Sequence, residues 1–150
     1  MPINWQHVAF SPKTSLIYAN TMHIGMTYEA PEPDKYVPGK PSGPGSVKRT
    51  EVLDDPNVRG YLKAIDPLTG KAKWQAGSDI PRLSGVLSTA GGVVFTGDLD
   101  GHLLALDAAT GRELWRQATG KAIGGGVITY EAGGRQYVAA ATGMNASTWN

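Results

Sequence analysis

The sequence repeats itself at an interval of 41 residues. Residues 60–74 and 101–115 carry the same amino acid at seven of fifteen aligned positions, namely Gly, Leu, Ala, Asp, Thr, Gly and Trp. These are the residue types that a strand, a tight turn and a second strand require. A period near 40 residues is typical of a β-propeller, in which each repeat forms one four-stranded blade.

The repeated unit predicts a strand followed by a turn. Leu62 and Ala64 lie two residues apart, and residues at this spacing share one face of a strand. Asp66 then opens a turn, because its carboxylate can accept hydrogen bonds from the backbone N–H groups that follow it. Gly70 supplies the left-handed conformation that closes the turn.

A tryptophan ends the second strand of the unit, at Trp74 and again at Trp115. Such a large flat side chain is suited to cover the seam between one sheet and its neighbour. We therefore expect the two tryptophans to occupy equivalent buried sites. The paired strands expected from the repeat are 60–66 with 71–75 and 102–107 with 112–117.

The same pattern predicts the fold class. The second unit contains four strands, the third stops after two, and the first supplies its own inner pair from 8–10 and 15–19. Because a closed propeller needs at least four blades, about three blades describe a partial β-propeller, all-β throughout, within a larger domain. The strands expected in the second unit are 85–90, 92–97, 102–107 and 112–117.

Residues 29–59 interrupt the first unit. They hold six of the ten prolines together with three glycines, and they show no hydrophobic periodicity. This composition predicts a long exposed loop inserted into a blade. Two interpretations remain open: a solvated insertion, or a cover over one mouth of a propeller. The expected organisation is a single unit, 1–150, of propeller blades with a Pro/Gly-rich loop at 29–59.

Composition excludes several kinds of site within these residues. The net charge is +1 and no dense basic cluster occurs, so neither nucleic acid nor an anionic membrane is expected as a partner. There is no cysteine, no apolar run that could span a bilayer and no signal-peptide pattern.

Asp98 and Asp100 flank a Gly-rich turn, where turn capping is favoured over calcium binding. The three histidines, His7, His23 and His102, have no metal-ligand spacing and are expected to be surface or packing residues.

Several segments resemble the quinoprotein alcohol dehydrogenases, which use pyrroloquinoline quinone (PQQ). The run 88–101, followed by the Ala-x-Asp-x-x-Thr-Gly-x-x-x-Trp pattern of 105–115, is similar to the C-terminal part of that family and to its tryptophan-docking motif. Residues 4–6 with 10–14, and residues 134–138, resemble further segments of the same family. The resemblance implies an eight-bladed propeller in which each docking tryptophan packs between adjacent blades.

The resemblance also implies where the cofactor would lie. Asn4 would be a polar contact to the quinone, Trp5 its supporting neighbour, and Trp149 a further candidate contact. The family carries a Trp shortly before the Ser-Thr-Ala-Gly-Gly run, whereas this chain reads Arg82-Leu83-Ser84-Gly85 there. No catalytic residue and no metal ligand is assigned to this segment, because the resemblance places the catalytic aspartate and the metal ligands upstream of Asn4.

The implied activity is the PQQ-dependent oxidation of alcohols to aldehydes in the periplasm. A calcium or lanthanide ion would polarise the quinone, and cytochrome c or a quinone would accept the electrons. The segment would contribute blade packing and a few cofactor contacts, would need the upstream blades as its partner, and is expected to be inactive alone. The expected partners are thus a small alcohol substrate and an electron acceptor.

Two other classes of protein stay open. A non-catalytic propeller scaffold of the outer-membrane assembly type would keep the docking repeats and have no use for Asn4 or the long loop. A WD-type interaction propeller would carry a Trp-Asp pair at the end of its third strand, where this chain has Ile65-Asp66 and Leu106-Asp107. The WD-type interaction propeller is therefore the least favoured of the three classes.

Overall fold

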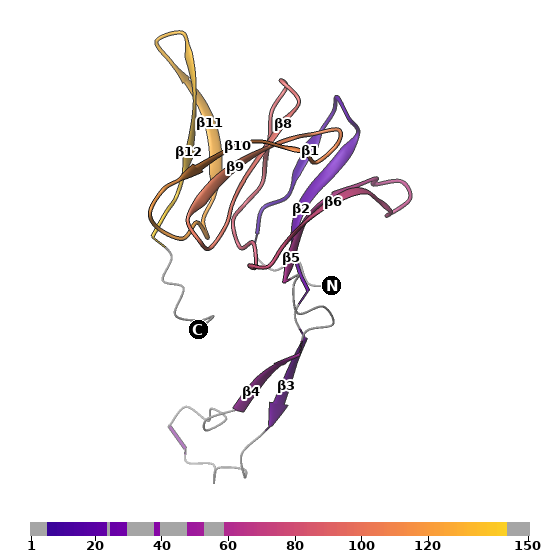
Figure 1. Ribbon diagram of the computed structural model, residues 1–150, viewed down its shortest axis with the longest axis vertical. Coiled ribbons are helices and arrows are strands. Elements are labelled where there is room, and N and C mark those ends of the chain that lie inside the picture. Colours follow the sequence, from indigo (N-terminus) through magenta and orange to yellow (C-terminus); the bar gives the residue numbers. More distant parts are fainter. Residues whose placement is uncertain (1–5, 24, 30–37, 40–47, 53–58, 144–150) are drawn as a thin grey trace.

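The computed structural model describes residues 6–23, 25–29, 38–39, 48–52 and 59–143, all as strands, turns and irregular segments (Figure 1). Two four-stranded antiparallel sheets form its body, and we call them blade 1 and blade 2. The described residues contain no helix that could cross a membrane. Blade 1 has the strand order β1 (Ala9–Ser11), β2 (Leu16–Met22), β5 (Gly60–Ile65) and β6 (Ala72–Ser78).

Blade 2 reproduces the same meander along the chain. Its order from the inner edge outward is β7 (Leu87–Ser88), β8 (Val93–Gly97), β9 (His102–Asp107) and β10 (Glu113–Ala118). A two-stranded sheet follows, half-blade 3, made of β11 (Val127–Ala132) and β12 (Arg135–Ala140). The all-β architecture and the partial propeller predicted from the repeat are confirmed, with strand ends that differ from the prediction by at most three residues.

The inserted segment 29–59 is entered through a strand pair that its composition did not indicate, because β3 ends at its first residue and β4 lies within it. β3 (Gly25–Glu29) pairs with β4 (Lys48–Val52) in a separate antiparallel hairpin, with Gly25 opposite Val52 and Glu29 opposite Lys48. The hairpin extends away from the blades between β2 and β5 (Figure 1). No proline lies in β3 or β4, which agrees with the exclusion of proline from paired strands.

The hydrophobic core lies between the facing sides of blades 1 and 2. Leu62 and Ala64 are fully buried on one face of β5, as their spacing predicted. Tyr18 is also fully buried, and its hydroxyl donates across the seam to the carbonyl of Ala108 at 2.9 Å. The buried residues of this cluster come from both blades: Leu16, Tyr18, Leu62, Ala64, Val86, Val94, Leu104, Leu106 and Ala108.

The predicted turns form as the sequence indicates. Asp66 Oδ1 accepts from the backbone N–H of Leu68 at 2.9 Å, and Gly70 adopts φ +68°. The equivalent Asp107 accepts from the backbone N–H of Thr110 at 2.9 Å, and Gly111 adopts φ +75°. These hydrogen bonds lower the pKa of both carboxyl groups.

The two docking tryptophans differ in their surroundings. Trp74 is partly buried and donates its indole N–H to the carbonyl of Ala108 at 3.0 Å. Trp115 is 46% exposed and its indole N–H has no partner among the described residues. The expectation of equivalent buried sites is therefore wrong for Trp115: blade 2 covers Trp74, while half-blade 3 lacks the outer strands that would cover Trp115.

Candidate functional site

The inner ends of three successive blades meet around one histidine. His7 lies two residues before β1, Gly85 two residues before β7, and Gly126 directly before β11. The backbone N–H of Val86 donates to the carbonyl of His7 at 3.1 Å, and that of Gly85 donates to the carbonyl of Gly125 at 3.0 Å. We call His7, Gly85 and Gly126 the axial cluster; they precede the first strand of each sheet, and β7 contacts both β1 and β11.

The His7 imidazole lies next to both glycines, at distances where an added Cβ would make ordinary contact. A Cβ atom at Gly85 would lie 3.4 Å from the His7 ring, and one at Gly126 would meet only His7 Nε2, at 3.9 Å. The His7 side chain is exposed, so its ring nitrogens can reach a ligand placed beside the two glycines. An imidazole can donate and accept hydrogen bonds, and a glycine surface permits close approach of a flat molecule.

A buried polar group joins the two blades next to the axial cluster. Asn20 Nδ2 on β2 donates to the carbonyl of Ser84 at 2.9 Å and to Thr96 Oγ1 on β8 at 2.7 Å. The Ser84 and Thr96 hydroxyl oxygens are 2.9 Å apart. The backbone N–H of Gly97 donates to Ser84 Oγ at 2.7 Å. We call Asn20, Ser84 and Thr96 the polar clamp; all three are at most 1% exposed.

A charged group lies beneath the same connection between blades. Arg82 is only 5% exposed, and its Nε and Nη1 have no hydrogen-bond partner among the described residues. Burial lowers the pKa of Arg82, and the carboxylate of Asp98 acts in the opposite sense. Asp98 Oδ1 accepts from the backbone N–H of His102 at 2.8 Å, and its Oδ2 lies 3.3 Å from His102 Nδ1. Asp98 therefore caps its turn, as predicted.

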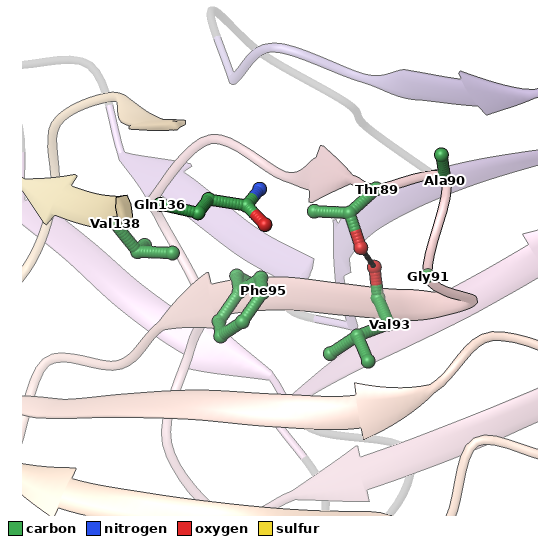
Figure 2. A pocket seen from close by; sticks show the side chains of 7 residues that line it. All are labelled: Thr89, Ala90, Gly91, Val93, Phe95, Gln136 and Val138. Atoms are coloured by element: carbon green, nitrogen blue, oxygen red, sulfur yellow. Dashed lines mark hydrogen bonds between the residues drawn. The ribbon is translucent and has the colours of Figure 1, made fainter. Parts of the chain in front are cut away.

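A cavity of about 380 Å³ separates blade 2 from half-blade 3 (Figure 2). Phe95 and Val138 form its apolar wall, and Gln136 reaches across it toward Thr89, whose hydroxyl donates to the carbonyl of Val93 at 3.1 Å. None of its seven lining residues titrates near neutral pH. The cavity is therefore a packing space between sheets, without the groups that acid–base chemistry requires.

Comparisons with known proteins identify the repeat. A family model described as outer membrane protein assembly factor BamB matches residues 58–148. The chain belongs to this repeat family. It is also 41% identical over 139 residues to the lanthanide-dependent methanol dehydrogenase of Methylorubrum extorquens, and 39% identical over 140 residues to the quinoprotein ethanol dehydrogenase of Pseudomonas aeruginosa.

These relatives are much longer than the chain. Each match covers 93% of this chain but only 23% and 22% of the two dehydrogenases. Among solved structures, a europium-containing methanol dehydrogenase superposes with a TM-score of 0.78 at 36% identity, covering 89% of this chain and 23% of that one. The quinohemoprotein alcohol dehydrogenase of Comamonas testosteroni gives a TM-score of 0.68 at 34% identity, covering 93% and 22%. The similarity to quinoprotein alcohol dehydrogenases inferred from the motifs is thus confirmed.

The site residues predicted from the resemblance are not part of this geometry. Asn4, Trp5 and Trp149 all lie outside the described residues. Sequence reasoning assigned His7 to surface or packing and did not connect it with Gly85 and Gly126. The signal available was positional: all three residues lie one or two positions before the first strand of a unit. Among the described residues no group of three His, Cys, Asp or Glu could hold a metal ion.

Proposed function

We propose that these residues are the C-terminal blades of a larger PQQ-dependent dehydrogenase that oxidises alcohols to aldehydes. The observation that carries the proposal is the match to named quinoprotein dehydrogenases over 93% of the chain at about 40% identity. This match to the dehydrogenases extends beyond residues 58–148, the range that the repeat-family model matches. The segment contributes blade packing and a part of the cofactor pocket.

The axial cluster fits a flat cofactor with a polar rim. Gly85 and Gly126 leave the backbone open beside the exposed His7 ring, and an imidazole can bond a carbonyl or carboxylate. Asn4 and Trp5 lie within three residues of His7 in the chain, which supports their assignment as cofactor contacts, with Trp149 as a further candidate. PQQ supplies the two-electron acceptor for alcohol oxidation, while the residues of this chain bind and orient it.

The rest of the enzyme supplies what this segment lacks. We assign the ligands of a calcium or lanthanide ion to other blades; one relative is named lanthanide-dependent and another structure europium-containing. Cytochrome c or a quinone is the proposed electron acceptor, since a relative of this chain is named a quinohemoprotein. The proposed compartment is the periplasm.

Reconstitution of the full-length polypeptide that carries these residues tests the function. The purified apoprotein is mixed with PQQ and either Ca²⁺ or La³⁺, and dye reduction is followed with methanol, ethanol and 1-butanol. We expect alcohol-dependent dye reduction that needs both PQQ and one metal. Omission of PQQ is the control. Absence of activity together with absence of quinone binding would contradict the proposal.

The proposed cofactor contact is tested by Asn4→Ala in the same polypeptide. Loss of a buried polar contact should weaken quinone affinity by about 1–3 kcal/mol in a fluorescence titration. The 150-residue chain alone should bind no quinone measurably, because it carries too few contacts. Unchanged affinity in Asn4→Ala would remove this residue from the pocket, and tight binding by the short chain would show that the pocket lies elsewhere.

A second candidate function is a non-catalytic propeller scaffold. The description of the matching family model, an outer-membrane assembly factor, favours it. Such a protein would have no use for a quinone. Stoichiometric binding of PQQ by the full-length polypeptide would exclude the scaffold, and failure to bind it with a folded propeller would favour it.

A further inference from the structure

We infer that Asn20 is a positioning residue for the axial cofactor site, acting through Ser84 on the segment that carries Gly85. This inference rests on the proposed PQQ-binding function. Asn20 itself lies on β2 within the interface between blades and is 1% exposed. It is therefore placed to set the geometry of the site without contacting a ligand.

In one arrangement of the polar clamp every amide and hydroxyl proton is used, and the carbonyl of Gly85, 3.1 Å from Ser84 Oγ, is a second acceptor within reach. The two N–H groups of Asn20 Nδ2 go to the Ser84 carbonyl and to Thr96 Oγ1. The Thr96 hydroxyl then donates to Ser84 Oγ, which also accepts from the Gly97 N–H. The Ser84 hydroxyl donates to the carbonyl of Gly97 at 3.0 Å. Each proton of this buried network has an acceptor, so removing one of its side chains would leave a further buried polar atom unpaired.

The clamp fixes a backbone segment, in addition to side chains. It holds both the carbonyl and the hydroxyl of Ser84, and the next two residues form the wall of the axial cluster. The N–H of Gly85 is bonded to Gly125, and the N–H of Val86 to His7. A shift of Ser84 would therefore be passed directly to the contacts among all three blades.

The amide of Asn20 is not explained by stability alone. Its Oδ1 is buried and has no hydrogen-bond partner among the described residues. An unpaired buried acceptor is unfavourable, whereas the remainder of this interface is built mainly from apolar side chains that need no partner. We attribute the presence of the Asn20 Nδ2 donor here to the orientation that it imposes on Ser84 and Thr96.

The test compares two variants of the full-length polypeptide that differ by one hydroxyl. Thr96→Val keeps the shape of the side chain and removes the acceptor for Asn20, whereas Thr96→Ser keeps the hydroxyl. We expect quinone affinity of the apoprotein, measured by fluorescence titration, to fall about tenfold in Thr96→Val and in Asn20→Ala. In Thr96→Ser it should stay within about threefold of the parent.

A destabilised control separates positioning from general stability. Trp74→Phe removes the hydrogen bond to Ala108 in the same interface but at a different place. It should lower the melting temperature and leave quinone affinity within about twofold of the parent. If Asn20→Ala and Thr96→Val lose no more affinity than this control, the positioning role is overturned.

Hydrogen exchange of the apoprotein gives a readout that needs no quinone. Peptides covering Gly85, Val86 and Gly97 should exchange faster in Asn20→Ala, while those covering β11 and β12 away from the seam should not. A parent protein that binds no quinone would overturn the proposed function and, with it, the cofactor role of Asn20. Quinone binding that is unaffected by Asn20→Ala would overturn only the inference about Asn20.

Discussion

The seam between blades 1 and 2 and the open face of blade 2 present the same motif in two states. At the seam, Trp74 lies over Gly111 and is bonded to Ala108, with the Tyr18 ring 5.8 Å away. On the open face, Trp115 is 46% exposed and lines an apolar groove of about 390 Å³ together with Val138 of half-blade 3. The comparison teaches that the tryptophan is only half of the docking unit: the other half is the Asp-x-x-Thr-Gly turn of the following blade.

The largest effect should come from filling the space beneath Trp74. In Gly111→Ala, the new Cβ would lie 2.5 Å from the Trp74 ring at a residue with φ +75°, so overpacking and backbone strain should together lower the free energy of unfolding by about 4 kcal/mol. Gly70→Ala is the matched control, with φ +68° and nothing within 4 Å, and should lose about 1 kcal/mol from backbone strain alone. Urea unfolding measures both. Equal losses of stability in Gly111→Ala and Gly70→Ala would mean that Trp74 does not pack on the turn at Gly111.

Truncation of the two tryptophans should give the next largest difference. Trp74→Ala removes packing and a hydrogen bond across the seam and should lower the free energy of unfolding by about 3 kcal/mol. Trp115→Ala removes a side chain that is 46% exposed and should lose about 1 kcal/mol or less. The two variants are compared by urea unfolding of the 150-residue chain. A loss in Trp115→Ala as large as that in Trp74→Ala would show that half-blade 3 covers Trp115 in solution.

A smaller effect is expected from the hydroxyl of Tyr18. Tyr18→Phe leaves the carbonyl of Ala108 with one donor fewer and should lower the free energy of unfolding by about 1 kcal/mol. Tyr130, which is 49% exposed and stacks on Tyr137, provides the control: Tyr130→Phe should change stability by less than about 0.5 kcal/mol. If Tyr18→Phe leaves the free energy of unfolding unchanged, the docking unit consists of the tryptophan and the turn that it packs on, without Tyr18.

The smallest effect concerns acid stability of the turns. Hydrogen bonds from Thr110 lower the pKa of Asp107 relative to its unfolded value, so this carboxylate stabilises the folded state above the unfolded pKa and loses that contribution as the pH falls through the folded pKa. In Asp107→Asn, the stability of the folded state should therefore differ less between neutral pH and a pH below about 4 than it does in the parent protein. Asp66→Asn should act in the same direction, because the hydrogen bonds from Leu68 and Thr69 lower the pKa of Asp66. Thermal unfolding as a function of pH is the measurement.

The repeat made most of the strands predictable, and local chemistry explains why. Alternating Leu and Ala, an Asp that caps its own turn and a Gly at positive φ act within a few residues of one another. The β3–β4 hairpin escaped prediction, because Gly25 and Val52 are brought opposite each other across 26 intervening residues, and the polar β4 lacks the alternation of a half-buried strand. The axial cluster escaped for a related reason, since His7 and Gly126 meet only after the blades have stacked.

The sequence alone determined the repeated strand–turn–strand unit and the fold class, because these depend on spacing within 15 residues and on a period of 41. The family was indicated by the resemblance of its segments to the quinoprotein alcohol dehydrogenases. Tertiary structure decided which copy of each repeated residue is buried or bonded across a blade interface. Arg82 and Ile123 stand 41 residues apart and both are buried, one as a guanidinium beside Asp98 and the other as an apolar side chain. Trp74 is partly buried, whereas Trp115 is 46% exposed. The physical reason is that burial and hydrogen bonding between blades depend on the neighbouring sheet, which no single repeat encodes.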